Sequence, residues 1–284
     1  MPKLSIITIN YNNLDGLKRT VESVVNQTWQ EFEYIIIDGG STDGSAAYIE
    51  SQSQHIDYWV SEKDSGIYNA MNKGIKVATG EYLLFLNSGD HLFNNNVLAE
   101  NNNWFEIYDL IYFNIQNVGY NFSKIVSYPD KLRFSDLFSG ILPHQATLFK
   151  RSLFEKLGLY DENLKIVADW KFMIVALFKY HCTYLKIDCL FSTFYLDGIS
   201  TLTDFSDEKN QVLKANFNDY FLDYKELESS RFILENNKKI LESNRFKMLA
   251  EIETTKFGRK MASFFLRMYI TLFSKKKLKD VLHK

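Results

Sequence analysis

Short apolar segments alternate with helical periodicity over the first third of the chain. The apolar segments are nearly uninterrupted, which is typical of strands buried on both faces of a parallel sheet. Between them, apolar residues recur three or four positions apart, which predicts helices over residues 14–25 and 67–78. This alternation predicts βαβ units, and therefore an α/β fold with a mostly parallel sheet flanked by helices. The predicted strands cover residues 4–9, 32–37, 56–60 and 82–86.

The rhythm changes after Asp90, where strands and helices no longer alternate regularly. From residue 207 the pattern is helical to the end, with no proline and only one glycine, Gly258. We therefore predict one domain over residues 1–203 and a helical C-terminal extension over 204–284. Before the extension, we expect helices at 97–105, 134–138, 152–158 and 169–180, and strands at 110–115, 122–127, 147–150, 183–187 and 191–196.

Three carboxylates follow successive predicted strands: Asp38, Asp64 and Asp90. In an open α/β sheet, ligands bind beyond the carboxyl ends of the strands, so these side chains are expected at one edge. A nucleotide diphosphate needs hydrogen-bond acceptors for its base and ribose, and a hard cation held by oxygen ligands for its phosphates. Each acid taken alone also fits an ordinary loop or capping residue, and both interpretations stay open.

The composition is that of a globular protein, with 46% hydrophobic and 24% charged residues in 284. A net charge of −2 gives no general attraction to nucleic acid, so we expect no nucleic-acid partner. The two cysteines, Cys182 and Cys189, form neither a zinc site nor a disulfide framework, and we expect reduced thiols in a cytoplasmic protein. No secretory signal is expected, because the apolar run at residues 4–9 is too short.

The charge is unevenly distributed, because residues 256–284 contain nine Lys or Arg and a single acid. A basic amphipathic helix of this kind can lie on an anionic membrane surface, at the inner face of the membrane. The alternative is an ordinary helix that packs on the body of the protein or on a second subunit of a homodimer. The apolar residues at helical spacing are Phe257, Met261, Phe264, Phe265, Met268 and Leu272.

Four motifs occur in a fixed order over the first ninety residues: residues 4–12, 38–45, 62–74 and 78–90. The second reads Asp-Gly-Gly-Ser-Thr-Asp-Gly-Ser, and the last ends in Leu-Asn-Ser-Gly-Asp. Together they resemble the family-2 inverting nucleotide-sugar glycosyltransferases, whose fold is the Rossmann-like GT-A type. A weaker likeness continues through His144-Gln145 to Asp169-Trp170, so that the resemblance covers roughly residues 3–200.

The resemblance implies a role for each matching residue of the donor pocket. Asp38 and Asp64 would meet the base or ribose, and Lys73 the base or phosphate. Asp90 would hold Mg²⁺ or Mn²⁺, at the end of the family's Asp-x-Asp-type motif. Relatives often carry further acids in that motif, but a single carboxylate is workable, because Mg²⁺ commonly uses one or two carboxylates plus phosphate oxygens and water. The remaining donor-pocket residues would be Thr8, Asn10, Asn12, Asn87, Ser88 and Gly89.

On the acceptor side, the resemblance assigns the catalytic base to Asp169, although Ala168 replaces the acid that often precedes it. Its position fits a helix N-cap or first-turn acid equally well. His144 and Gln145 would lie beside the acceptor or phosphate pocket. Without the resemblance, His144 is more simply interpreted as a structural histidine.

The expected function is transfer of a sugar, with inversion, from a nucleotide-diphosphate sugar that we expect to be UDP-linked. The resemblance implies a sugar hydroxyl on a bacterial surface glycan or its lipid-linked precursor as the acceptor. One alternative is a non-catalytic sugar-nucleotide-binding subunit, which would need Asp38, Asp64 and Asp90 but not Asp169. The other is a sugar nucleotidyltransferase, which the lack of a Gly-rich, basic phosphate loop near the amino terminus disfavours.

Overall fold

A computed structural model describes residues 2–104, 107–140, 142–196 and 204–273. Contacts within the chain divide it into two compact units, Met1–Asn216 and Phe217–Lys284. The predicted boundary at 203 falls at the end of residues 197–203, which lie outside the described residues. The division of the chain into domains stays a prediction.

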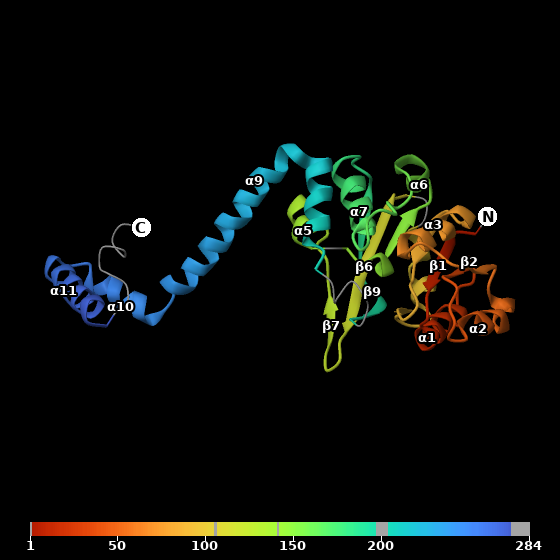
Figure 1. Cartoon of the computed structure of the whole chain (residues 1–284), viewed down its shortest axis with the longest axis horizontal. Helices are drawn as coiled ribbons and strands as arrows, with labels where there is room; N and C mark the ends of the chain where they lie inside the picture. Colours follow the sequence, from red (N-terminus) through yellow and green to blue (C-terminus); the bar gives the residue numbers. More distant parts are fainter. Residues whose placement is uncertain (1, 105–106, 141, 197–203, 274–284) are drawn as a thin grey trace. The chain divides into compact units, whose positions relative to one another are not determined.

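The first unit is built on a sheet, whose strands β1, β2, β6, β7 and β9 are labelled in Figure 1. Its strand order is β3-β2-β1-β4-β8-β6-β9-β5, with β7 added beside β6. Its first four strands run parallel, as the alternation in the sequence predicts. In the register of these strands, Asn10 lies beside Asp38, and Asp38 beside Ser61. The four strands are β1 (Leu4–Asn10), β2 (Phe32–Asp38), β3 (Tyr58–Ser61) and β4 (Tyr82–Phe85).

The other strands complete the sheet in mixed orientation. Strand β8 (Thr147–Lys150) is antiparallel to both β4 and β6 (Leu110–Val118), while β9 (Tyr184–Tyr195) is parallel to β6. The prediction of two strands at 183–187 and 191–196 is wrong, because a register shift lets β9 continue past its polar middle. The short strands β5 (His91–Leu92) and β7 (Ser123–Val126) pair antiparallel with β9 and β6.

Helices connect and cover the strands of the first unit (Figure 1). The predicted helix at 97–105 is interrupted: α4 (Val97–Glu100) is followed by the 3₁₀ turn η2 (Asn102–Trp104). The side-chain amide of Asn101 donates a hydrogen bond from Nδ2 to the Val97 carbonyl at 2.8 Å, and so competes with continuation of the helix. The other elements are α1 (Leu14–Val25), α2 (Ser45–Ser51), η1 (Ser53–His55), α3 (Ile67–Val77), α5 (Phe134–Ser139), η3 (His144–Ala146), α6 (Ser152–Leu157) and α7 (Ala168–Phe178).

The core of this unit lies on both faces of the central strands. Every residue of β1 and of β4 is buried, as expected for strands covered on both sides. Helix α3 packs on β1 and β2, and Gly74 permits a very close approach. A Cβ atom at Gly74 would lie 2.5 Å from Ile7 Cγ2, well inside van der Waals contact. The distance between α3 and the sheet therefore depends on this residue having no side chain.

Helix α9 (Ser206–Leu241) is interrupted at Phe217, whose φ of −139° and ψ of 35° are not helical. The second unit continues through α10 (Asn244–Ile252) and α11 (Lys256–Phe273). Ser243 caps α10 by accepting a hydrogen bond from the Phe246 amide at 3.2 Å. The predicted helical extension is thus confirmed up to residue 273. In the described part of the chain, no helix is both long and apolar enough to cross a membrane.

Candidate functional site

The carboxyl ends of β1, β2 and β3 bring polar side chains together at one edge of the sheet. Asp38 is fully buried and accepts hydrogen bonds from Asn10 Nδ2 at 2.7 Å and from Ser61 Oγ at 2.6 Å. It also accepts from the backbone N–H and hydroxyl of Ser41, at 2.9 and 2.6 Å. Burial raises the pKa of Asp38, but these hydrogen bonds outweigh it and lower the pKa below its usual value. Asp38 is therefore a fixed, ionised acceptor.

Asp64 lies directly beside the loop that follows Asp38. Its Oδ1 accepts from the Gly66 amide at 3.0 Å, and a Cβ at Gly39 would lie only 2.5 Å from its Oδ2. The structure therefore brings Asp38 and Asp64 close together, as their positions after neighbouring strands predict. Asn12 joins the same region: its Oδ1 accepts from the Thr42 amide at 2.8 Å, and so fastens the loop after β1 to the loop after β2.

Two other residues expected in the donor pocket have partners inside the protein. Thr8 is fully buried, and its hydroxyl donates to the Leu86 carbonyl at 2.8 Å, which ties β1 to the end of β4. Lys73 on α3 forms an ion pair with Glu62 at 2.7 Å, in the stretch that precedes Asp64. The nucleotide-binding roles of Thr8 and Lys73 stay predictions.

The loop after β4 is held against α1 by a set of hydrogen bonds. Gly89 has a φ of +109°, which favours glycine, and its carbonyl accepts from Arg19 Nε at 3.0 Å. The Thr20 hydroxyl accepts from the Gly89 amide at 3.0 Å and donates to the Asp90 carbonyl at 2.6 Å. Asn13 Nδ2 donates to the Ser88 carbonyl at 3.0 Å. Helix α1 thus fixes the backbone that presents Asp90.

The Asp90 carboxylate is buried and points toward two segments that come much later in the sequence. Its Oδ2 accepts from Gln145 Nε2 at 3.0 Å, and its Oδ1 lies 3.4 Å from the Tyr195 amide. The Arg19 guanidinium lies over the Tyr195 ring, 4.1 Å from its centre. The end of β9 and the turn before β8 therefore close around the loop that follows β4.

Asp169, on the first turn of α7, has a hydrogen-bond donor at each carboxylate oxygen. Tyr68 OH donates to Oδ1 at 2.9 Å, and His144 Nδ1 lies 2.9 Å from Oδ2. Burial raises the pKa of Asp169, but the hydrogen bond and electrostatic attraction of His144, together with the Tyr68 hydrogen bond, lower it overall. Burial and the neighbouring Asp169 charge raise the pKa of Tyr68, which keeps it protonated as a donor.

His144 connects Asp169 to the loop after β4. Its Nε2 lies 3.2 Å from Asn87 Nδ2, and an amide nitrogen can only donate. Nε2 is therefore the accepting nitrogen, which leaves the ring proton on Nδ1 to be donated to Asp169.

The structure thus joins the predicted residues into two neighbouring clusters. One contains Asn10, Asp38 and Asp64, and the other contains Asp90 and Asp169, which contact the adjacent residues Gln145 and His144. Sequence reasoning missed several residues, because their partners are distant in sequence: Tyr68 and Asp169 are 101 residues apart. Only Tyr68 had a signal, its place within the third motif. The missed residues are Asn13, Arg19, Thr20, Tyr68 and Tyr195.

The family can now be assigned. The model of the family described as "Glycosyl transferase family 2" matches residues 5–158, which contain the strand ends, the loop after β4 and His144. The chain belongs to glycosyl transferase family 2. It is 35% identical over 209 residues to an uncharacterized glycosyltransferase of Mycobacterium tuberculosis, a match that covers 70% of this chain and 78% of that protein. It is 32% identical over 180 residues to a PGL/p-HBAD biosynthesis glycosyltransferase of the same species, covering 61% and 69%.

Solved structures of glycosyltransferases share the fold. TarS residues 1–349 of S. aureus in complex with UDP-GlcNAc matches with a TM-score of 0.57 at 16% identity, over 98% of this chain and 77% of that one. The mannosyltransferase PcManGT of Pyrobaculum calidifontis, in complex with GDP-Man and Mn²⁺, matches with a TM-score of 0.53 at 14% identity, over 97% and 88%. These likenesses confirm the predicted GT-A-type sheet flanked by helices.

The residues around Asp90 fit a divalent cation whose remaining ligands come from phosphate oxygens and water. No group of three His, Cys, Asp or Glu side chains that could hold a metal occurs among the residues that the structure describes. One carboxylate is nevertheless enough where phosphate oxygens and water supply the remaining ligands. Asn87, in the same loop, contributes a buried Oδ1 that has no hydrogen-bond partner in the described part of the chain. Asp90 and Asn87 thus supply hard oxygen donors of the kind that Mg²⁺ and Mn²⁺ prefer.

Proposed function

We propose that this protein is an inverting glycosyltransferase that moves a sugar from a nucleotide-diphosphate sugar, expected to be UDP-linked, to a sugar hydroxyl. The observation that carries this proposal is the Asp169 carboxylate, which is buried, ionised and held by Tyr68 and His144. His144 also contacts Asn87, so the acid is connected to the loop that carries Asp90. A base connected in this way to a donor-binding loop is what direct displacement at a sugar carbon requires.

In the proposed reaction, Asp169 accepts the proton of the acceptor hydroxyl. The acceptor oxygen forms a bond to the anomeric carbon from one face while the bond to the nucleotide diphosphate breaks on the other, which inverts that carbon. A carboxylate offers about four lone-pair positions, and the donors Tyr68, His144 and the Trp170 backbone N–H use three of them, which leaves room for the acceptor hydroxyl. General-base assistance of this kind contributes roughly 10²–10⁴-fold to the rate.

At the donor end, we propose that the cluster of Asn10, Asp38 and Asp64 binds the base and ribose. Asn10 is buried, and its Oδ1 has no hydrogen-bond partner among the described residues, so it can accept an N–H from the base. Asp38 already accepts four hydrogen bonds, and its contribution is to hold Asn10 and Ser41 in place. The neighbours bound to UDP-GlcNAc and GDP-Man support a nucleotide-sugar donor, as does the match to the family.

A divalent cation, Mg²⁺ or Mn²⁺, would be held by Asp90, with Asn87 Oδ1 as a second oxygen donor. When bound there, the ion neutralises charge that develops on the departing diphosphate. Gln145 and the Tyr195 amide hold the Asp90 carboxylate in one orientation. Arg19 and Thr20 fix the backbone of the same loop.

For the acceptor, we propose a hydroxyl on a surface glycan or on a lipid-linked precursor. The relative named for PGL/p-HBAD biosynthesis supports an acceptor of this general kind. A lipid-linked acceptor lies at a membrane, so the proposal places the enzyme in the cytoplasm or on the inner face of that membrane.

The decisive experiment compares Asp169→Asn with the wild-type protein. We expect the variant to lose about 10²–10⁴-fold in turnover while it retains donor binding, measured by calorimetry with Mn²⁺ and a panel of nucleotide sugars. Asp161→Asn is a matched control, because Asp161 is also an ionised acid beside α7 but pairs with Lys171 at 2.6 Å. The anomeric configuration of the product, read by NMR, tests inversion.

Two outcomes would contradict the proposal. A wild-type protein that binds nucleotide sugar but transfers nothing to any acceptor, with Asp169→Asn unchanged, would indicate the non-catalytic binding subunit. A product with retained configuration would exclude direct displacement assisted by Asp169.

A further inference from the structure

Helix α11 has a strongly asymmetric surface. Its four basic residues, Lys256, Arg259, Lys260 and Arg267, lie within one sector, and the helix contains no acid. At 100° per residue, the large apolar side chains occupy most of the remaining circumference. Several are widely exposed to solvent, including Phe257 at 76%, Phe264 at 61% and Leu272 at 64%. A large contiguous apolar surface on a globular protein usually binds a partner or a membrane.

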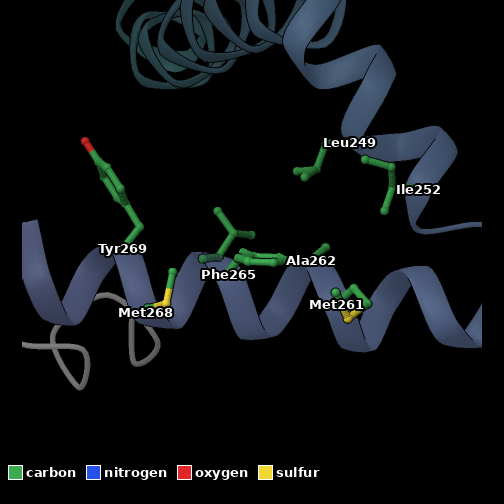
Figure 2. A pocket seen from close by; sticks show the side chains of 8 residues that line it. Leu249, Ile252, Met261, Ala262, Phe265, Met268 and Tyr269 are labelled. Atoms are coloured by element: carbon green, nitrogen blue, oxygen red, sulfur yellow. The ribbon is translucent and has the colours of Figure 1, made fainter.

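An apolar groove lies between α10 and α11, with a volume of about 550 Å³ (Figure 2). Leu249 and Ile252 from α10 lie across from residues of α11 such as Phe265 (Figure 2). Every residue that lines the groove is apolar or aromatic, so water inside it finds few hydrogen-bond partners. Flexible hydrocarbon chains would fill such a groove more favourably than water does.

Charge distinguishes this surface from the helix that precedes it in the sequence. Helix α9 also exposes large apolar residues, such as Phe232 and Leu234, each at 67%. However, α9 contains six basic and seven acidic side chains, whereas α11 contains four basic and no acidic side chains. Of these two helices, α11 is therefore the one that combines exposed apolar side chains with a charge complementary to anionic groups.

We propose that α10 and α11 form a docking surface for a bilayer that contains anionic lipids. The apolar side chains of α11, among them Phe264 and Leu272, enter the boundary between headgroups and acyl chains. Lys256, Lys260 and Arg267 remain at the level of the lipid phosphates, as long basic side chains do at interfaces. The groove between the helices accommodates acyl chains. This docking makes the location given under the proposed function more specific, and it does not depend on the transfer chemistry.

The first test is binding of the full-length protein to vesicles without donor or acceptor. We expect it to float with vesicles of phosphatidylcholine containing about one third phosphatidylglycerol, and to bind pure phosphatidylcholine at least tenfold more weakly. Each basic residue near an anionic surface contributes about a factor of five to partitioning. K260E/R267E should therefore lower the affinity by about 25-fold or more, and 0.5 M salt should weaken wild-type binding similarly.

A second test separates membrane docking from general hydrophobic adhesion. We expect F264Q/L272Q to lower vesicle binding about tenfold or more, while F232Q/L234Q, which alters equally exposed residues of α9, leaves it unchanged. Circular dichroism checks that each variant keeps its helices, and where F264Q/L272Q loses them, the K260E/R267E result decides. Asp169→Asn should bind vesicles as the wild type does, which keeps this test independent of the proposed reaction.

The proposal is overturned if wild-type protein ignores anionic vesicles, or if the α9 variant loses as much binding as the α11 variant. A third result would identify a different occupant. If light scattering shows a dimer that F264Q/L272Q converts to a monomer, while vesicles bind neither form, the surface is an interface between two copies of this chain.

Discussion

The edge of the sheet in the first unit and the helices of the second unit differ in which side chains they bury and which they expose. At the edge, charged groups such as Asp38 and Asp169 are buried and accept hydrogen bonds from distant segments. In α9, large apolar groups such as Phe232 are exposed, and the ion pair Arg231–Glu235 joins neighbours on the same helix. Buried polar groups fix one geometry, whereas helices with local contacts keep their surfaces available for a partner.

The largest expected effect concerns Asp90, whose carboxylate is the proposed anchor of the cation. Asp90→Asn should weaken Mn²⁺ binding, measured by electron paramagnetic resonance in the presence of donor, and lower turnover by about 10³-fold, because stabilisation of diphosphate charge by a metal is worth several kcal/mol. Asp188→Asn is the control, since Asp188 is an exposed acid paired with Lys186. Equal Mn²⁺ binding by the Asp90 variant and wild type would exclude Asp90 as the ligand.

Next in size is Asp38, which supports the edge of the sheet. Asp38→Asn should lower the free energy of unfolding by about 2–3 kcal/mol, because it replaces a charged acceptor inside a buried network. The pKa of Asp38 is lowered by folding, so this stabilisation is present above the ordinary carboxyl pKa of about 3.9 and is lost as the pH falls below it. Urea unfolding at pH 7 and pH 3 measures both effects.

Exposed Asp15, which lies 4.0 Å from Lys18, provides the control for Asp38. Asp15→Asn should change the unfolding free energy little at either pH. A difference between Asp38→Asn and wild type that grows toward pH 3 would contradict the assignment of Asp38 as an ionised acceptor.

A smaller effect is expected at Tyr68. Tyr68→Phe removes one of the donors that lower the pKa of Asp169, so the acid limb of the pH–rate profile should move to higher pH. Tyr160→Phe is a closely matched control, because its ring lies 5.7 Å from that of Tyr68 and its buried hydroxyl has no hydrogen-bond partner among the described residues. The same shift in both variants would show that the Tyr68 hydroxyl does not tune Asp169.

The smallest effect is expected in α9. Arg231→Ala removes an exposed pair with Glu235, whose atoms lie 3.4 Å apart, and should change the unfolding free energy by no more than about 0.5 kcal/mol. Urea unfolding checks this value. A loss comparable with that of Asp38→Asn would show that the two regions do not differ in the way described.

The strand ends of the first unit were predictable, because the decisive features are local. Continuous apolar segments place β1, β2 and β4, and the parallel order then brings Asn10 and Asp38 side by side. The interruption after α4 was harder to predict from the sequence, because it depends on the Asn101 side-chain amide bonding back to the Val97 carbonyl. The continuity of β9 depends on a register shift against β6, which periodicity does not report.

The partners of the predicted acids were the least accessible from the sequence. Asp169 is recognisable by its motif, but its engagement by Tyr68 and His144 depends on how α3, η3 and α7 meet in space. Likewise, the sequence places Asn87 in the donor pocket, and only its distance of 3.2 Å to His144 shows that it sets the tautomer of that ring. A pattern along the chain indicates which groups are chemically capable, whereas tertiary contacts determine their proton affinities.

The absence of a side chain at Gly74 has a consequence for the pKa of Asp169. Tyr68 and Gly74 belong to the same helix, so an added methyl group that moves α3 relative to Ile7 would also change the hydrogen bond between Tyr68 and Asp169. The spacing between helix and sheet would thereby alter the pKa of Asp169, the proposed base. A substitution at Gly74, away from the proposed donor pocket, would therefore be expected to shift the pH dependence of the proposed reaction.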